Sequence, residues 1–274
     1  MDGSKKRGFT LVELLVVISI IALLMAILMP SLQKAKSQAR KILCQSRLRN
    51  WSNYFTMYQG DNNGNFLGGL TYITDGEYVH EPKSAGYSWL VLLRPYFAPQ
   101  MKGDPRDDES VYKIACCPEA DKPWYDLDGN GNPVSGPGQP GTPGCAWGKF
   151  YNEFCDHPLG AFGSFSLNLF ATGPHESGMY PNDPDNYFIL NQTRHSLNKI
   201  PLLTDGTMHM FHTYEGIDEV PDYDGQASIK GTHGNVMLNR HDGFICGVFA
   251  DMSVRQIGIK EVVRLKWGQL FDVD

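Results

Sequence analysis

The sequence predicts an α+β fold in which one long N-terminal helix packs on an antiparallel β-sheet head. Two observations support this prediction. An apolar run from Phe9 to Met29 continues past Pro30 as a helical pattern that extends to about Gln59. The remaining residues, 61–274, contain many glycines and aromatic residues and several short apolar runs that are typical of strands. An antiparallel sheet beside a long helix is an α+β arrangement.

The first predicted element is an apolar helix over residues 9–30. Between Phe9 and Met29 only three residues are not apolar, namely Thr10, Glu13 and Ser19. A helix of about 21 residues is about 31 Å long, which matches the hydrocarbon core of a bilayer. A secretory signal peptide also starts with a basic stretch, but it is shorter and ends at a small-residue cleavage site, which this run lacks. We therefore expect a transmembrane helix.

The segment Gly8-Phe9-Thr10-Leu11-Val12-Glu13, after the short basic leader 1–8, resembles the processing site of type IV prepilins and of type II secretion pseudopilins. The resemblance implies that prepilin peptidase cuts between Gly8 and Phe9 and methylates the new amino group of Phe9. A carboxylate in hydrocarbon is costly and usually functional. In the family, the residue at the position of Glu13 neutralises the amine of a neighbouring subunit and so sets the axial register. The simpler alternatives are a signal-anchor helix and a Glu13 that snorkels to the membrane edge.

This resemblance implies a structural subunit of a type II secretion pseudopilus or of a type IV pilus-like filament. Its partners would be prepilin peptidase, other pilin or pseudopilin subunits, the inner-membrane assembly platform and membrane lipid. The protein would cross the inner membrane once, with its N-terminus cytoplasmic and its head periplasmic, and would then join a periplasmic or surface filament. The simplest positive-inside rule would keep the six basic residues between positions 34 and 49 in the cytoplasm. We infer the opposite orientation, with this segment in the periplasm, from the N-terminal motif. The alternative is a membrane-tethered extracytoplasmic binding module, which the large head favours.

Residues 31–60 are predicted to form the periplasmic half of the same helix. Apolar residues recur there at a spacing of three to four, as in Leu48, Trp51, Phe55 and Tyr58. We interpret Pro30 as a bend within one long helix. The helix should end in the stretch Gly60-Asp-Asn-Asn-Gly64.

The globular β-rich head, 61–274, contains candidate strands and two candidate helices. The strands are predicted at Leu70–Ile73, Val111–Cys116, Phe165–Leu169, Tyr187–Leu190, Ile200–Thr204, Gly243–Ala250 and Ser253–Ile257, and the helices at Ser88–Phe97 and Lys260–Phe271. A tight turn at Asp251-Met252 predicts a C-terminal hairpin. The spacing from His241 to Asp251 resembles the His-x9-Asp-Gly signature of large pilin-like proteins of planctomycete-group bacteria, with Met252 in place of the glycine.

Six cysteines are available in a head that should be exported to an oxidising compartment, so up to three disulfides are predicted with open connectivity. They are Cys44, Cys116, Cys117, Cys145, Cys155 and Cys246. The sequence has no Cys-x-x-Cys pair, which disfavours a zinc ribbon. Asp205, His209 and His212, with His233 and His241 downstream, suggest a transition-metal site. In a strand, however, His209 and His212 would face opposite sides, so we expect no bound metal or other cofactor there.

The stretch Gly129–Gly144 contains ten glycines and prolines in sixteen residues and is predicted to be a loop without helix or strand. Asp126, Asp128 and Asn130 stand at alternate positions at its start, like the first half of an EF-hand calcium loop. Pro137 occupies the position of the bidentate glutamate. The alternatives are a calcium turn completed by ligands from elsewhere and a simple polar turn.

The formal charge of −6 disfavours general nucleic-acid binding, so we expect no nucleic-acid partner. The chain contains no Gly-x-Ser-x-Gly, His-Glu-x-x-His or phosphate-loop motif. We therefore expect a protein that is not an enzyme.

Overall fold

The computed structural model describes residues 10–67, 72–74, 77–79, 89–100, 114–120, 122–123, 125–127, 133–135, 145–146, 163–172, 196–206, 210–211, 226–228, 235–237, 240–262 and 264–268. The chain divides into two compact units, Met1–Arg40 and Lys41–Asp274. The division falls within the first helix, so this helix contributes to both units.

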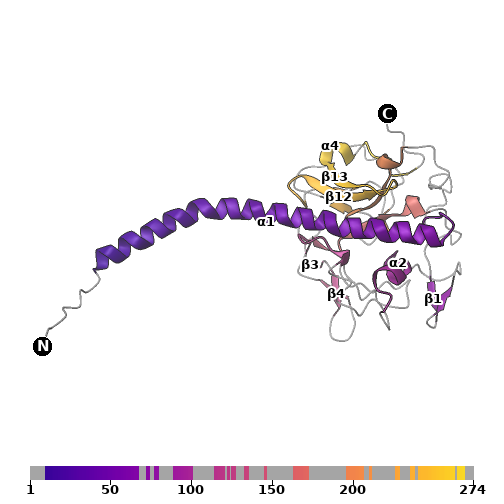
Figure 1. Ribbon diagram of the computed structural model, residues 1–274, viewed down its shortest axis with the longest axis horizontal. Coiled ribbons are helices and arrows are strands. Elements are labelled where there is room, and N and C mark those ends of the chain that lie inside the picture. The colour runs from indigo at the N-terminus through magenta and orange to yellow at the C-terminus, as the bar shows by residue number, and fades with distance from the viewer. Residues whose placement is uncertain are drawn as a thin grey trace. The chain divides into compact units, whose positions relative to one another are not determined.

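Helix α1, Leu11–Asp61, is one continuous helix of 51 residues that runs through Pro30 (Figure 1). It ends because Asn63 adopts a positive φ of 56°. The amide of Gly64 then donates a hydrogen bond of 2.8 Å to the carbonyl of Gln59, which is the six-to-one bond of a Schellman cap. The prediction of one long helix with its end in this stretch is confirmed.

The first unit presents an apolar helix surface. The large apolar side chains between Leu11 and Met29 are 45–80% exposed. The segment has a mean hydropathy of 3.0, and α1 is long and apolar enough to cross a membrane. This surface is consistent with a single-pass membrane anchor.

The second unit is built on one sheet with the strand order β13-β12-β8-β7-β9. The strands are β7 (Phe165–Asn168), β8 (Pro201–Asp205), β9 (Met210–Phe211), β12 (Phe244–Phe249) and β13 (Val254–Gly258). Neighbouring strands from β13 to β7 are antiparallel, and the short edge strand β9 pairs parallel with β7. The α+β prediction is therefore confirmed.

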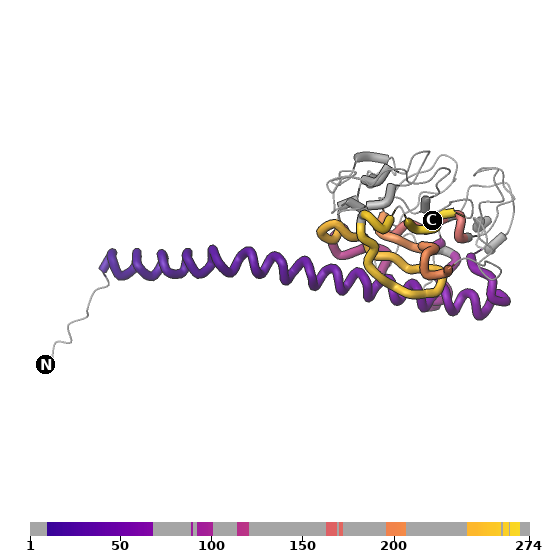
Figure 2. The backbone as a smooth tube through the Cα atoms, turned by 90° about the horizontal axis from the view of Figure 1, so that it is seen from above, coloured from indigo at the N-terminus to yellow at the C-terminus, as the bar shows by residue number. Residues whose placement is uncertain are grey.

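The second half of α1 lies beside this sheet, as Figures 1 and 2 show. Its buried residues are Cys44, Leu48, Trp51, Ser52 and Phe55, which recur at helical spacing along one face. The Ser52 hydroxyl donates a 2.7 Å hydrogen bond to the Met252 carbonyl, and so fixes the helix to the hairpin of β12 and β13. One stripe of α1 is thus part of the core of the second unit.

The hairpin of β12 and β13 confirms the predicted C-terminal turn. Asp251 accepts hydrogen bonds from the amide and hydroxyl of Ser253, at 3.0 and 2.6 Å. Met252 has a φ of +63°, a conformation that glycine adopts without strain. The backbone therefore explains why a glycine would fit at this position of the His-x9-Asp-Gly pattern.

The two predicted head helices have different outcomes. Helix α2, Trp89–Phe97, agrees with its predicted range. Helix α4, Ile259–Val262, is much shorter than predicted. It ends early because the amide of Lys266 bonds to the carbonyl of Lys199, at 2.9 Å, rather than continuing the helix.

Two sequence predictions are wrong in the described residues. Ile114 and Ala115 are helical rather than extended, and the Ile114 carbonyl accepts the indole N–H of Trp51 at 2.8 Å. The stretch Gly129–Gly144 is not free of strand, because β5 (Pro133–Ser135) pairs antiparallel with β4 (Tyr125–Leu127). Proline is tolerated there because it stands first in a strand of a two-stranded sheet.

Two 3₁₀ helices, Leu169–Thr172 and Leu197–Lys199, and three further pairs of short strands are also described. The strand pairs are β1 (Tyr72–Thr74) with β2 (Glu77–Val79), β3 (Lys122–Pro123) with β6 (Cys145–Ala146), and β10 (Gln226–Ser228) with β11 (Asn235–Met237). The first pair overlaps the strand predicted at Leu70–Ile73. The strand predicted at Tyr187–Leu190 lies outside the described residues.

Candidate functional site

The start of α1 carries a reciprocal cap between Thr10 and Glu13. The Glu13 amide donates to the Thr10 hydroxyl at 3.2 Å, while Glu13 Oε2 accepts the Thr10 amide at 2.8 Å and the Thr10 hydroxyl at 2.7 Å. This is a capping box, which satisfies backbone donors that the first turn of a helix leaves unpaired. The sequence reasoning missed this role of Glu13, although the Thr-x-x-Glu spacing was its signal. The predicted cleavage residues Gly8 and Phe9 lie outside the described residues.

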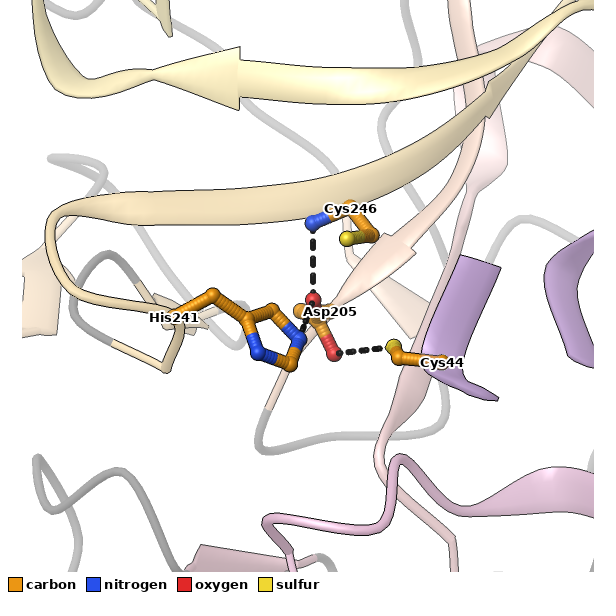
Figure 3. Close-up of side chains that lie close together, drawn as sticks. All are labelled: Cys44, Asp205, His241 and Cys246. Atoms are coloured by element: carbon orange, nitrogen blue, oxygen red, sulfur yellow. Dashed lines mark hydrogen bonds and ion pairs between the residues drawn. The ribbon is translucent and has the colours of Figure 1, made fainter. Parts of the chain in front are cut away.

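A buried polar cluster lies within the second unit, and we call it the thiol–carboxylate cluster. Its members are Cys44, Cys117, Asp205, Arg240, His241 and Cys246, and all are buried. Figure 3 shows four of them converging, with Cys44 from α1, Cys246 from β12, Asp205 from the end of β8, and His241 from the turn before β12. Residues distant in sequence therefore meet in one buried place.

Asp205 is the centre of this cluster. Its Oδ2 accepts the amide of Cys246 at 2.8 Å and lies 3.5 Å from Nε2 of His241. Its Oδ1 lies 3.2 Å from Nε of Arg240 and accepts a long contact of 3.9 Å from the Cys44 thiol. The carboxylate is fully buried, and these partners offset the cost of removing its charge from water.

A further thiol of the cluster, that of Cys117, also contacts His241. Its Sγ lies 3.3 Å from Nε2 of the imidazole. Its own amide donates a 2.6 Å hydrogen bond to the hydroxyl of Ser164, which holds the residue in place. The Asp205 carboxylate and the Cys117 sulfur therefore both lie close to the same ring nitrogen of His241, Nε2.

A turn of two residues presents His241 to the cluster. Asp242 and Gly243 have φ values of 56° and 88°, and the amide of His241 donates to the Phe244 carbonyl at 3.0 Å. Two successive positive φ angles are typical of a type I′ turn, for which Asp-Gly is a preferred pair. The turn places His241 three residues before Phe244, where β12 begins, and five residues before Cys246.

The charges of the cluster members influence one another. Burial disfavours the imidazolium of His241, but hydrogen bonds to Asp205 and Cys117 outweigh burial and raise its pKa to about 12. Burial also opposes ionisation of Cys117, yet hydrogen bonds from Cys44 and His241 lower its pKa to about 6. The hydrogen bond from Cys44 lowers the pKa of Cys246, whereas burial raises the pKa of Cys44 well above its usual value. The site favours anionic sulfur beside a cationic ring.

The cluster brings together some predicted site residues and separates others. Cys44, Cys117 and Cys246 meet there, while Cys116 is buried and burial raises the pKa of its thiol to about 12. All four are free thiols, and oxidation of the exported head stays a prediction. The structure describes only the backbone of Cys145, in β6, and Cys155 lies outside the described residues.

The structure describes more of the predicted transition-metal site than of the predicted calcium turn. Asp205 and His241 do lie together, but with cysteines as neighbours, while His209, His212 and His233 lie outside the described residues. Of the candidate calcium ligands, Asp126 lies within strand β4, and Asp128 and Asn130 lie outside the described residues. His241 is the member of the predicted histidine pattern that lies beside Asp205 in the described residues, whereas Cys44 and Cys246 were not part of that pattern because they are distant in sequence.

A long N-terminal helix with an exposed apolar first half, followed by an α+β head, is consistent with a single-pass membrane-anchored protein. The prokaryotic N-terminal methylation motif matches residues 3–29 of this chain. The chain is also similar to the type IV wide pilus major component PilA4 of Thermus thermophilus, at 46% identity over 57 residues. That alignment covers 21% of this chain and 44% of PilA4, and no solved structure matches. Over its N-terminal part the chain is therefore similar to type IV pilins, and the resemblance to type IV pilins inferred from the N-terminal sequence is confirmed.

Proposed function

We propose that this protein is a structural subunit of a type IV pilus-like filament or of a type II secretion pseudopilus, without catalytic activity of its own. Prepilin peptidase would cut after Gly8 and methylate Phe9, and the inner-membrane assembly platform would then add the subunit to others of its kind. Before assembly the head would be periplasmic and the helix would anchor it in the inner membrane.

The main support is the combination of the methylation motif with an apolar helix whose large side chains have 45–80% exposure between Leu11 and Met29. Such a surface needs either lipid or neighbouring apolar helices to cover it. Before assembly, the lipid of the bilayer would cover this surface. In a filament whose subunits pack through these helices, the apolar helices of neighbouring subunits would cover it.

Glu13 has the geometry for two roles. Among the described residues, the hydrogen bonds to the Glu13 carboxylate both come from Thr10, and both are accepted by Oε2. We propose that Oε1 meets a cation, such as the methylated amine of a neighbouring subunit. The cap and the intersubunit pair would use different oxygens of one side chain.

Three substitutions separate these roles. Glu13→Gln keeps a side chain that can cap a helix at this position but removes the charge. Glu13→Val removes both, and Thr10→Val removes the hydroxyl while keeping the carboxylate. Each variant would be produced with the native assembly machinery, and sheared filaments would be compared by blotting, with mass spectrometry of the mature N-terminus to verify processing.

If charge pairing sets the register, Glu13→Gln and Glu13→Val should both be processed and both fail to enter filaments, while Thr10→Val should enter. If the Glu13→Gln variant forms filaments at wild-type levels, charge pairing by Glu13 is excluded and only its capping role remains. Filaments isolated from the native cell test the broader proposal. Repeated copies of the chain support a structural subunit, whereas its absence from them, or a location only at the tip, supports a tethered binding module.

A further inference from the structure

We propose that the thiol–carboxylate cluster is a structural metal site for a zinc-class divalent ion, with Cys44, Asp205, His241 and Cys246 as ligands. This inference concerns the second unit and does not depend on filament assembly. Nothing in the N-terminal motif or in the PilA4 alignment assigns a metal to the chain.

The first argument is geometric. One ligand atom from each of the four residues lies within 4.8 Å of the other three. Four ligands around a tetrahedral zinc ion, with bonds of about 2.0–2.3 Å, are separated from one another by about 3.3–3.8 Å. Closing the cluster onto an ion therefore requires shifts of about an ångström, which side-chain rotation can supply.

The second argument is the chemistry of the donors. Two thiols, one imidazole and one carboxylate are donors that zinc accepts, and thiolates disfavour harder ions such as magnesium and calcium. Full burial from water is typical of a closed structural site rather than of a catalytic site with an open position.

The third argument is charge. Two thiolates and a carboxylate carry three negative charges, and a divalent ion leaves one. Arg240, whose Nε lies 3.2 Å from Asp205 Oδ1, offsets the remaining charge. The four ligands, the ion and Arg240 would thus together carry a charge close to zero.

The position of the ligands gives the ion a structural role. They come from α1, from the end of β8, from the turn before β12, and from β12 itself. An ion held by all four would join the helix stripe to the two central strands, which lie next to one another in the sheet. The binding free energy would then add to the stability of the fold.

The rival use of these thiols is a disulfide, which an oxidising compartment favours. A bridge between two cysteines would consume two thiolates and leave Asp205 and His241 without a metal to share. The two states exclude each other, so a single set of measurements distinguishes them.

The test uses the full chain in detergent micelles. After reduction and chelation, the protein would be titrated with Co²⁺ and then with Zn²⁺. We expect one equivalent of Co²⁺, a thiolate-to-cobalt charge-transfer band, and displacement by Zn²⁺. Cys246→Ser and His241→Ala should each weaken Co²⁺ binding at least tenfold. Cys116→Ser is the matched control, because Cys116 is a buried thiol outside the four ligands, and it should bind like the wild type.

Several results would overturn the proposal. Absence of stoichiometric binding in the reduced wild type would do so, as would a cobalt spectrum without a thiolate band, and the latter does not depend on any variant folding. Protein isolated from the periplasm without reductant with a Cys44–Cys246 disulfide would establish the rival state. Loss of binding in Cys117→Ser, together with full binding in Asp205→Asn, would remove Asp205 from the ligand set.

Discussion

Trp51 offers a quantitative test of how α1 is held in the head. Its indole is fully buried, and its ring makes edge-to-face contacts with Trp89 at 4.6 Å, Phe97 at 5.3 Å and Tyr54 at 5.4 Å between centroids. Its N–H donates a hydrogen bond of 2.8 Å to the Ile114 carbonyl. Replacing a buried tryptophan by alanine costs about 3–5 kcal/mol, and the carbonyl left without its donor adds about 1 kcal/mol.

Trp51→Ala should therefore lower the free energy of unfolding by about 4–6 kcal/mol, which is a large share of the stability of a typical domain. Trp51→Phe keeps a ring but loses the donor, so we expect a loss of about 1–3 kcal/mol. Urea unfolding of the full chain in micelles, followed by near-ultraviolet circular dichroism, measures both. Met57→Ala is the control, because Met57 lies on the same helix with 51% exposure and should change stability by less than about 0.5 kcal/mol. A loss below about 1 kcal/mol in Trp51→Ala would refute the view that this stripe anchors the helix.

Two further predictions concern backbone positions. A Cβ at Gly247 would lie 2.9 Å from Ile257 Cδ1 and 3.1 Å from Thr204 Cγ2, so Gly247→Ala should destabilise the sheet by about 1–3 kcal/mol in the same urea assay. Gly60→Ala, with no atom within 4 Å of its new Cβ, should instead stabilise α1 by about 0.5–1 kcal/mol, and equal effects at the two glycines would contradict the packing argument. Met252→Val should melt at a lower temperature than Met252→Gly, because a β-branched residue fits poorly at a φ of +63°. Equal melting temperatures would show that this turn relaxes.

The sequence was sufficient to predict the long helix and the central strands because both depend on local pattern. The apolar run and the spacing of Leu48, Trp51 and Phe55 specify a helix and the face that it buries. Strands β8 and β12 are short apolar segments bounded by turn residues, and their predicted ranges agree with the structure to within about two residues. In contrast, Ile114 and Ala115 have a strand-like composition but are helical, and the Ile114 carbonyl accepts the indole N–H of Trp51. Tertiary contacts overrode local propensity there.

The cluster as a whole could not be predicted in the same way, because Cys44 and Cys117 are far from Asp205 and His241 in the chain. The contact between Cys44 and Asp205 spans 161 positions, and that between Cys117 and His241 spans 124. No short sequence motif can indicate contacts between residues that are so far apart in the chain. The cap of Glu13 is the opposite case, since the Thr-x-x-Glu spacing is local and sufficient to indicate it.

The helix stripe also determines where the head can be separated from its anchor. A cut before residue 61 follows the visible end of α1, but it would remove Leu48, Trp51 and Phe55 from the core and Cys44 from the cluster. A cut at Lys41, where the second compact unit begins, keeps all four. We therefore expect a chain that starts at Lys41 to unfold cooperatively in urea and one that starts at Asp61 to lack a cooperative transition, because an exposed sheet face cannot replace a helix that contributes to the core. Cooperative unfolding of the shorter chain would show that the sheet forms its core without α1, and the anchor and head would then be separate modules.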